Sequence, residues 1–198
     1  MLPNRRGEHS SGFEFLAANP PGWLNHGIAL AASRCGAIGI LNCEGQGPDA
    51  LPAIGRAFER ILKSGRGAIG LKIDAHSSRA LVLASKPRQA LDCIVVAGRK
   101  EQDSLIRAAS PLCRRVFAEV FSVDQATAAV AAGAQGLIAK GHEAGGAVGE
   151  ETAFVLLQSL MARFPDVPVF AHGGIGLHSA AAGYAAGAAG LWLGGQLL

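Results

Sequence analysis

Three apolar, strand-like segments in the second half of the chain each lead directly into glycines, and this pattern constrains the fold most. The segments are 136–140, 167–171 and 189–193, and the loops that follow them read GHEAGG, HGGIG and GGQ. Glycines after a strand expose backbone N–H groups, and without Cβ atoms a phosphate or a flat ring can approach closely. Two such loops on neighbouring parallel strands predict a phosphate-binding site on a parallel α/β barrel.

Strand-like and helix-like patterns alternate along the whole chain. The expected strands are 13–18, 36–41, 67–73, 91–97, 116–121, 136–140, 167–171 and 189–193. The expected helices are 25–34, 48–64, 77–84, 102–109, 122–132, 150–163 and 177–186. Eight strands with seven connecting helices predict a compact (β/α)8 TIM barrel that lacks the final helix. A doubly wound open sheet is the alternative, but the strand count is high for that class.

Local signals fix some of the expected helix ends. Ser122 is an expected N-cap, with Gln125 as its capping-box partner, and Gly133 is expected to end the same helix.

The length of 198 residues predicts one domain. We expect residues 1–12 to form a flexible N-terminal segment and residues 13–198 to form the barrel. The sequence stops directly after the eighth strand, where an eighth helix normally covers apolar outward faces. Without that helix, apolar outward faces near the first and last strands would meet water, so we expect either that the barrel is part of a longer polypeptide or that something else covers these faces.

Composition argues against several classes of partner. The formal net charge is +3, and no basic block is interleaved with aromatic residues, so we expect no nucleic-acid partner. The first dozen residues lack the apolar run of a signal peptide, and no stretch reads as a membrane span. The four cysteines form no C-x-x-C pair, and no histidine cluster has zinc spacing, so we expect no metal site. The expected location is cytoplasmic.

Three motifs resemble those of a known family. They are GHEAGG at 141–146, VFAHGGI at 169–175 and AAGAAGLWLG at 185–194. In order and spacing this half of the chain resembles the nitronate monooxygenases, once called 2-nitropropane dioxygenases, a family that includes the flavin-dependent enoyl-acyl-carrier-protein reductases. The first half of the chain resembles this family less closely.

The resemblance implies an FMN-dependent oxidoreductase that acts on a small or acyl-carrier-bound substrate. In the reductase version, NADH or NADPH is a further expected partner. Similar barrels occur inside polyketide and fatty-acid synthases, so other domains of such a synthase are expected neighbours. The expected cofactor-binding residues are Lys72, Gly141, Ala144, Gly145, Gly146, Gly173, Gly174, Gly194, Gly195 and Gln196.

Several positions depart from the family pattern. Ala147 stands where members usually have a catalytic histidine, Lys72 replaces an expected asparagine, and Gly195 replaces a hydroxyl residue. The first strand also leads into Asn-Pro-Pro instead of a loop of small residues. Three functions therefore stay open: a nitronate-oxidising enzyme, an enoyl reductase domain of a synthase, and a degenerate, non-catalytic barrel.

The candidate catalytic residues are two histidines at strand ends. His142 begins the loop that contains Ala147 and could supply the missing proton transfer. The alternative for His142 is a loop histidine with a backbone hydrogen bond. His172 precedes the phosphate glycines and is expected to point into the barrel mouth.

Charged residues near the same strand ends each have two interpretations. Lys72, and to a lesser extent Lys140, could place a cation beside the flavin N1–C2=O edge. The alternative is a structural ion pair with Asp74 or Glu119. Glu143 is expected to organise its loop rather than to transfer protons.

Overall fold

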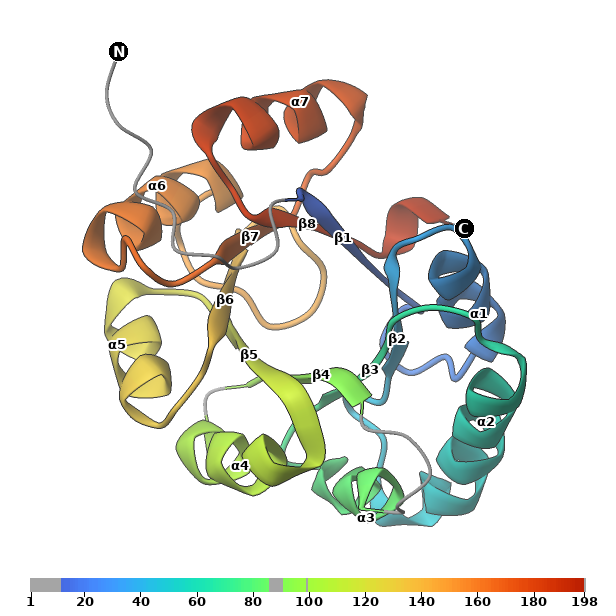
Figure 1. Cartoon of the computed structure of the whole chain (residues 1–198). Coiled ribbons are helices and arrows are strands. Elements are labelled where there is room, and N and C mark those ends of the chain that lie inside the picture. The colour runs from blue at the N-terminus through green and yellow to red at the C-terminus, as the bar shows by residue number, and fades with distance from the viewer. Residues whose placement is uncertain (1–11, 86–90, 99, 198) are drawn as a thin grey trace.

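The computed structural model describes residues 12–85, 91–98 and 100–197, so most of the expected N-terminal segment lies outside the described residues. Eight parallel strands form a closed barrel in sequence order, and β8 pairs with β1 to close it (Figure 1). The strands are β1 (Glu14–Ala18), β2 (Ile38–Asn42), β3 (Ile69–Ile73), β4 (Leu91–Val96), β5 (Cys113–Val120), β6 (Gly136–Lys140), β7 (Val169–His172) and β8 (Gly190–Leu193). The expected TIM barrel is confirmed.

Helices surround the barrel as an outer ring (Figure 1). They are α1 (His26–Arg34), α2 (Leu51–Ser64), α3 (Leu81–Ala84), α4 (Gln102–Ala109), α5 (Val123–Ala131), α6 (Ala153–Arg163) and α7 (Leu177–Ala186). Short 3₁₀ turns are η1 (Pro48–Ala50), η2 (Ser78–Ala80), η3 (Ser110–Leu112) and η4 (Gly195–Leu197). Within the described residues, only η4 follows β8.

Capping explains where two helices begin. Helix α6 starts at Ala153 rather than at 150, because the Thr152 hydroxyl accepts a hydrogen bond from the Val155 N–H at 3.3 Å. Helix α5 has the expected N-cap, since Ser122 Oγ accepts from the Gln125 N–H at 3.2 Å. The Gln125 side chain, however, accepts from the Phe121 N–H and not from the N-cap residue itself.

The core has two layers, because successive strand side chains point to opposite faces. One layer lies between strands and helices, and the other fills the barrel interior. Phe117 and Phe170 occupy the interior with ring centroids 5.1 Å apart. A Cβ on Gly136 would lie 2.6 Å from the Phe117 ring, and one on Gly190 would lie 2.7 Å from the Phe170 ring. These glycines therefore make room for the two rings.

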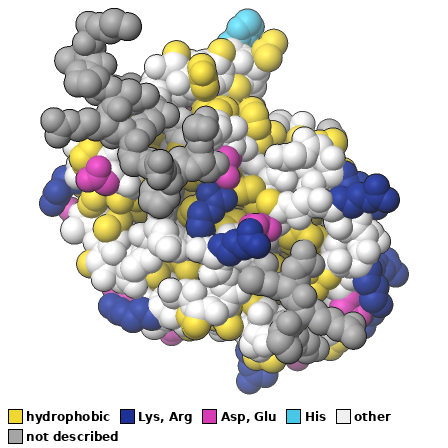
Figure 2. Space-filling view, in the orientation of Figure 1, with side chains coloured by type: hydrophobic (Ala, Val, Ile, Leu, Met, Phe, Trp, Pro, Cys, Tyr) yellow, Lys and Arg dark blue, Asp and Glu magenta, His cyan; other side chains and the backbone are white. Residues whose placement is uncertain are grey.

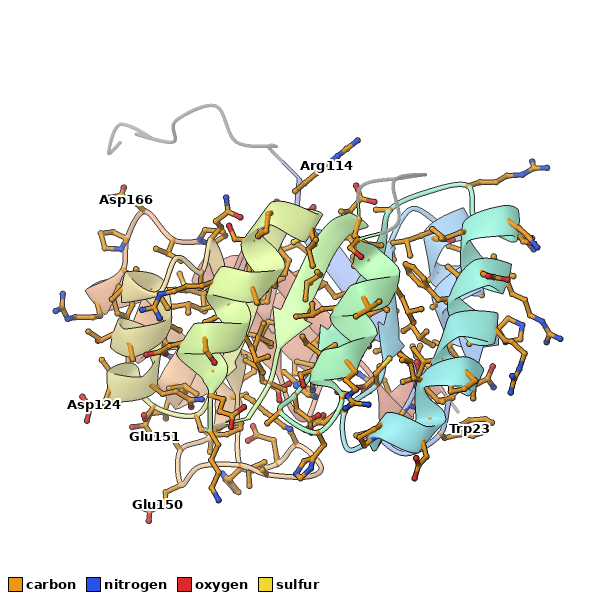
Figure 3. All side chains as sticks on the ribbon, turned by 90° about the horizontal axis from the view of Figure 1, so that it is seen from below. Trp23, Arg114, Asp124, Glu150, Glu151 and Asp166 are labelled. Carbon is orange, nitrogen blue, oxygen red and sulfur yellow. The ribbon has the colours of Figure 1, made fainter. Side chains whose placement is uncertain are left out.

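The two ends of the barrel differ. In the view of Figure 2, basic and acidic side chains meet near the middle of the face, with apolar side chains around them. At the amino ends of the strands, the Arg115 guanidinium donates to both carboxylate oxygens of Glu14 at 2.7 and 3.0 Å. Figure 3 shows Arg114 and Asp166 at one end of the barrel and Trp23 and Glu150 at the other. The latter end carries the loops that follow the strands.

Candidate functional site

A buried cluster of charged side chains lies at the carboxyl ends of four strands. Glu119 on β5 is fully buried, and its Oε2 lies 2.7 Å from Lys72 Nζ on β3. Its Oε1 lies 3.1 Å from Lys140 Nζ on β6. The Nδ1 atom of His172 on β7 is 3.2 Å from Glu119 Oε2. One carboxylate thus joins two lysines and a histidine inside the barrel mouth.

Two further residues complete this layer. Glu44, in the loop after β2, places its Oε2 at 2.9 Å from Lys72 Nζ, so Lys72 lies between two carboxylates. Trp192 on β8 lies with its ring centroid 5.0 Å from Lys72 Nζ and 5.4 Å from the His172 ring. The ion pair with Glu119, considered from the sequence as an alternative for both lysines, is confirmed.

Burial and ion pairing shift the pKa values of the charged groups in opposite directions. Burial alone would raise the pKa of Glu119, but Lys72, His172 and Lys140 hold that pKa well below its usual value. Burial would lower the pKa of Lys72, yet Glu119 and Glu44 raise it above its usual value. At neutral pH, Glu119 is therefore a carboxylate and Lys72 an ammonium ion.

His172 points into the barrel mouth, as the sequence predicts, and its side chain is 15% exposed. Burial lowers its pKa, and the two nearby ammonium groups lower it further, against the raising effect of Glu119. The imidazole is thus neutral at neutral pH.

The glycine loops after β7 and β8 lie beside each other. Gly173 and Gly174 have φ values of +125° and +60°, conformations that side-chain-bearing residues rarely adopt. A Cβ on either would come within 3.1–3.2 Å of Glu143 Cγ. Gln196 links the two loops, because its side chain accepts from the Gly194 N–H at 2.8 Å and donates to the Ile175 carbonyl at 3.4 Å.

The loop after β6 folds back over the mouth. Glu143 accepts from the Ala153 N–H with both carboxylate oxygens, at 3.0 and 3.1 Å, and so caps helix α6. Gly141 is buried against the Ala153 backbone, where a Cβ would collide. A Cβ on Gly146 (φ +81°) would lie 3.6 Å from Lys140 Nζ. The organising role expected of Glu143 is confirmed.

A family model described as nitronate monooxygenase matches residues 66–198, which is more than half of the chain. The chain belongs to the nitronate monooxygenase family. No curated protein sequence matches it.

Solved structures share this barrel. FabK from Thermotoga maritima is 25% identical with a TM-score of 0.79, over 92% of this chain and 58% of that one. A nitroalkane oxidase from Streptomyces ansochromogenes is 20% identical with a TM-score of 0.70, over 90% of this chain and 64% of that one. A structure titled native KDPGal is 25% identical with a TM-score of 0.61, over 92% of this chain and 84% of that one. This nitronate monooxygenase family member thus spans less than two thirds of the first two chains.

His142 lies apart from the charge cluster. Its side chain is 52% exposed, and its Nδ1 lies 3.7 Å from Glu143 Oε2. Its backbone N–H donates to the Glu151 carbonyl at 2.9 Å. This contact fits the expectation of a loop histidine with a backbone hydrogen bond, and the catalytic role of His142 stays a prediction.

The residues at the mouth of this family member fit a flavin phosphate. Gly173 and Gly174 leave a backbone surface that a Cβ would fill, and both belong to the loop that leads into helix α7, whose amino end favours anions. A Cβ on Gly195 or Gly145 would meet no heavy atom within 4 Å, so open space lies beside both. The flavin contacts of these residues remain proposals.

The unusual loop after β1 is held by an amide pair. Asn19 Nδ2 donates to the Asn42 carbonyl at 3.0 Å, and the Asn42 N–H donates to Asn19 Oδ1 at 2.8 Å. Asn19 also donates to the Trp23 carbonyl at 2.8 Å. The Asn-Pro-Pro sequence therefore forms an ordered rim of the barrel.

Sequence reasoning missed the central place of Glu119 and the contributions of Glu44 and Trp192. A signal was available for Glu119, which is the sole charged residue in the apolar segment 116–121. It lies two residues after Phe117, so alternation turns both side chains inward. No comparable pattern marks Glu44, which lies in a loop.

The described residues contain neither a cluster that could hold a metal ion nor a helix that could span a membrane. Within residues 12–85, 91–98 and 100–197, no cluster of three or more His, Cys, Asp or Glu side chains could hold a metal ion. In the same ranges, no helix has the length and apolar character needed to span a membrane.

Proposed function

We propose that this chain is the FMN-binding barrel of a flavin-dependent oxidoreductase of the nitronate monooxygenase type. Its substrate is a small organic molecule or an acyl thioester, and its location is cytoplasmic. The observation that carries the proposal is the pair of glycine loops after β7 and β8, linked by Gln196. TIM barrels frequently bind phosphate at this position, through the loops that follow strands seven and eight.

The proposal assigns a role to each part of the mouth. Gly173, Gly174, Gly194 and Gly195 bind the FMN phosphate through backbone N–H groups. The loop of Gly141, Ala144, Gly145 and Gly146 contacts the flavin ring.

The charged residues and His172 act on the flavin ring and on the substrate. Bound FMN supplies a carrier for two electrons. Lys72, kept as an ammonium ion by Glu119 and Glu44, stabilises negative charge in the mouth. His172 exchanges a proton with the substrate, and the apolar barrel interior beneath excludes water.

FMN titration of the purified chain tests the proposal. We expect the flavin spectrum to change on binding and the protein to resist unfolding better, by about 2.7 kcal/mol at an FMN concentration of 100 Kd. A protein that shows neither a spectral change nor a thermal shift with excess FMN would overturn it.

An enoyl reductase domain of a polyketide or fatty-acid synthase is the second candidate, supported by the 25% identity to FabK. Stopped-flow mixing separates the candidates. Rapid reduction of bound FMN by NADH or NADPH favours the reductase, whereas reduction by a nitronate alone favours the oxygenase.

A non-catalytic barrel within such a synthase is the third candidate, supported by Ala147 in place of the family histidine. Turnover by the chain or by its parent polypeptide, with either substrate class, would exclude this candidate.

A further inference from the structure

We propose that Glu119 is a positioning residue that fixes His172 in the Nδ1–H tautomer, so that Nε2 accepts a proton from the bound substrate. The role of Nε2 rests on the proposed function, whereas the tautomer rests on the distances and charges within this cluster and needs no bound FMN.

The tautomer follows from what Glu119 can do. An ionised carboxylate only accepts hydrogen bonds. Its Oε2 lies 3.2 Å from His172 Nδ1, so Nδ1 must carry the proton. In a neutral imidazole the other nitrogen, Nε2, then has a free lone pair.

The other charged groups around the ring favour the same state. Lys72 and Lys140 each contact Glu119, and Glu44 contacts Lys72, so two ammonium ions balance two carboxylates. A proton added to His172 would leave this buried layer with an uncompensated positive charge. Trp192, the remaining neighbour, carries no charge and lies against the ring with centroids 5.4 Å apart. The ring is therefore held neutral.

Nε2 is also accessible from the mouth. The His172 side chain is 15% exposed, and among the described residues no hydrogen bond engages Nε2. A substrate carbon acid in the mouth, with a C–H bond beside a nitro or carbonyl group, could lose that proton to Nε2. The C–H electron pair stays on the substrate as a nitronate or enolate. A neutral histidine suits this removal of a proton better than the delivery of one.

The tautomer can be measured without any assay of activity. We would record long-range ¹H–¹⁵N spectra of the histidine side chains in the full chain at pH 7, with and without FMN. The His172→Asn variant identifies the signals of His172, and His178→Asn, which removes an exposed histidine of α7, is the matched control. We expect a neutral ring protonated at Nδ1, with a titration midpoint below the usual 6.5.

Variants of Glu119 separate positioning from structural support. Glu119→Asp keeps the charge and should keep the Nδ1–H tautomer, whereas Glu119→Gln should lose this preference. Loss of an orienting carboxylate costs up to about 10⁴-fold in kcat in the serine protease triad. If Glu119→Gln does not fold, the wild-type spectrum still decides the tautomer.

The outcomes distinguish this inference from the proposed function. An Nε2–H tautomer or an imidazolium ion at pH 7 would overturn the inference, whether or not FMN binds. Failure to bind FMN with the Nδ1–H tautomer intact would overturn the proposed function and the proton-accepting role, and would leave the role of Glu119 in fixing the tautomer standing.

Discussion

At the residue scale, the mouth of the barrel is organised by a single carboxylate. Glu119 is shared by Lys72, Lys140 and His172, which come from three other strands. The two lysines give up nearly all contact with water, so both depend on the carboxylate for compensation. The cluster holds equal numbers of carboxylates and ammonium ions. Removal of one of them therefore leaves a buried charge without a partner, and this lowers stability by more than the lost contacts alone.

Replacement of Glu119 tests this dependence. Glu119→Gln should lower the free energy of unfolding by about 3–5 kcal/mol, because two buried ammonium ions lose their shared anion. Urea unfolding measures the change, and Glu150→Gln, which alters an exposed loop acid, is the control. A loss below about 1 kcal/mol, the level of a surface ion pair, would contradict the cluster's structural role.

The same groups predict how stability depends on pH. The folded-state pKa of Glu119 lies below 4.5 and that of His172 below 6.5, so the unfolded state binds more protons on the acid side. Stability should therefore fall as the pH is lowered below 6.5, where unfolded histidine gains a proton, and fall further below 4.5, where unfolded glutamate does. The raised pKa of Lys72 adds a loss only as the pH rises above 10.5. Unfolding free energies measured from about pH 2 to 8 check the acid side, and a flat profile would contradict it.

Two histidine variants test the catalytic proposals. His172→Asn should lower turnover by about 10²- to 10⁴-fold, the usual contribution of a positioned acid or base. His142→Ala should lower it by at least about tenfold if His142 serves the position left vacant by Ala147. Both variants should still bind FMN, because the proposed contacts are mainly to the backbone. Unchanged turnover in either variant would remove that residue from the site.

At the element scale, the sequence predicts the eight strands and seven helices of the described residues, because the buried strands are short apolar runs and turn or cap residues, many of them glycines, separate them from the helices. Exact ends are harder to predict, since caps such as Thr152 decide them. The charged cluster at the barrel mouth is still harder to predict from the sequence. Lys72 and Glu119 are 47 residues apart in the chain, and only barrel closure and strand register bring them together.

The loop after β6 offers a test at this scale. Glu143→Ala should lower the free energy of unfolding by about 1 kcal/mol, the typical loss when a helix cap is removed. It should also weaken FMN binding, because the Glu143 side chain lies beside the phosphate loop, 3.1–3.2 Å from where a Cβ on Gly173 or Gly174 would stand. Glu151→Ala, which changes an exposed acid of the same loop, is the control. Equal stability and FMN affinity in the two variants would contradict the capping role.

At the scale of the whole molecule, the barrel is closed, but some large apolar side chains on its outer surface are exposed to solvent. On the outside of β1, Phe15 is 39% exposed, and Tyr184 on α7 is 68% exposed. Phe13 packs edge-on against both rings, with centroids 5.4 and 5.3 Å away. The apolar outward face expected near the first strand is thus present, and it lies away from the mouth.

FMN affinity is the measurement that tests the central claim most directly. Gly174→Ala adds a methyl group to the proposed phosphate loop at a φ of +60°, and Gly133→Ala adds one at a φ of +106° at the end of α5. Both variants carry backbone strain, but only the first adds a methyl group within the proposed phosphate loop, where it would lie 3.2 Å from Glu143 Cγ, whereas the second meets open space. We predict that wild type and Gly133→Ala bind FMN equally and that Gly174→Ala binds it at least about tenfold more weakly, a loss of about 1.4 kcal/mol. Equal FMN affinity in all three folded proteins, or no FMN binding by the wild type, would contradict the account.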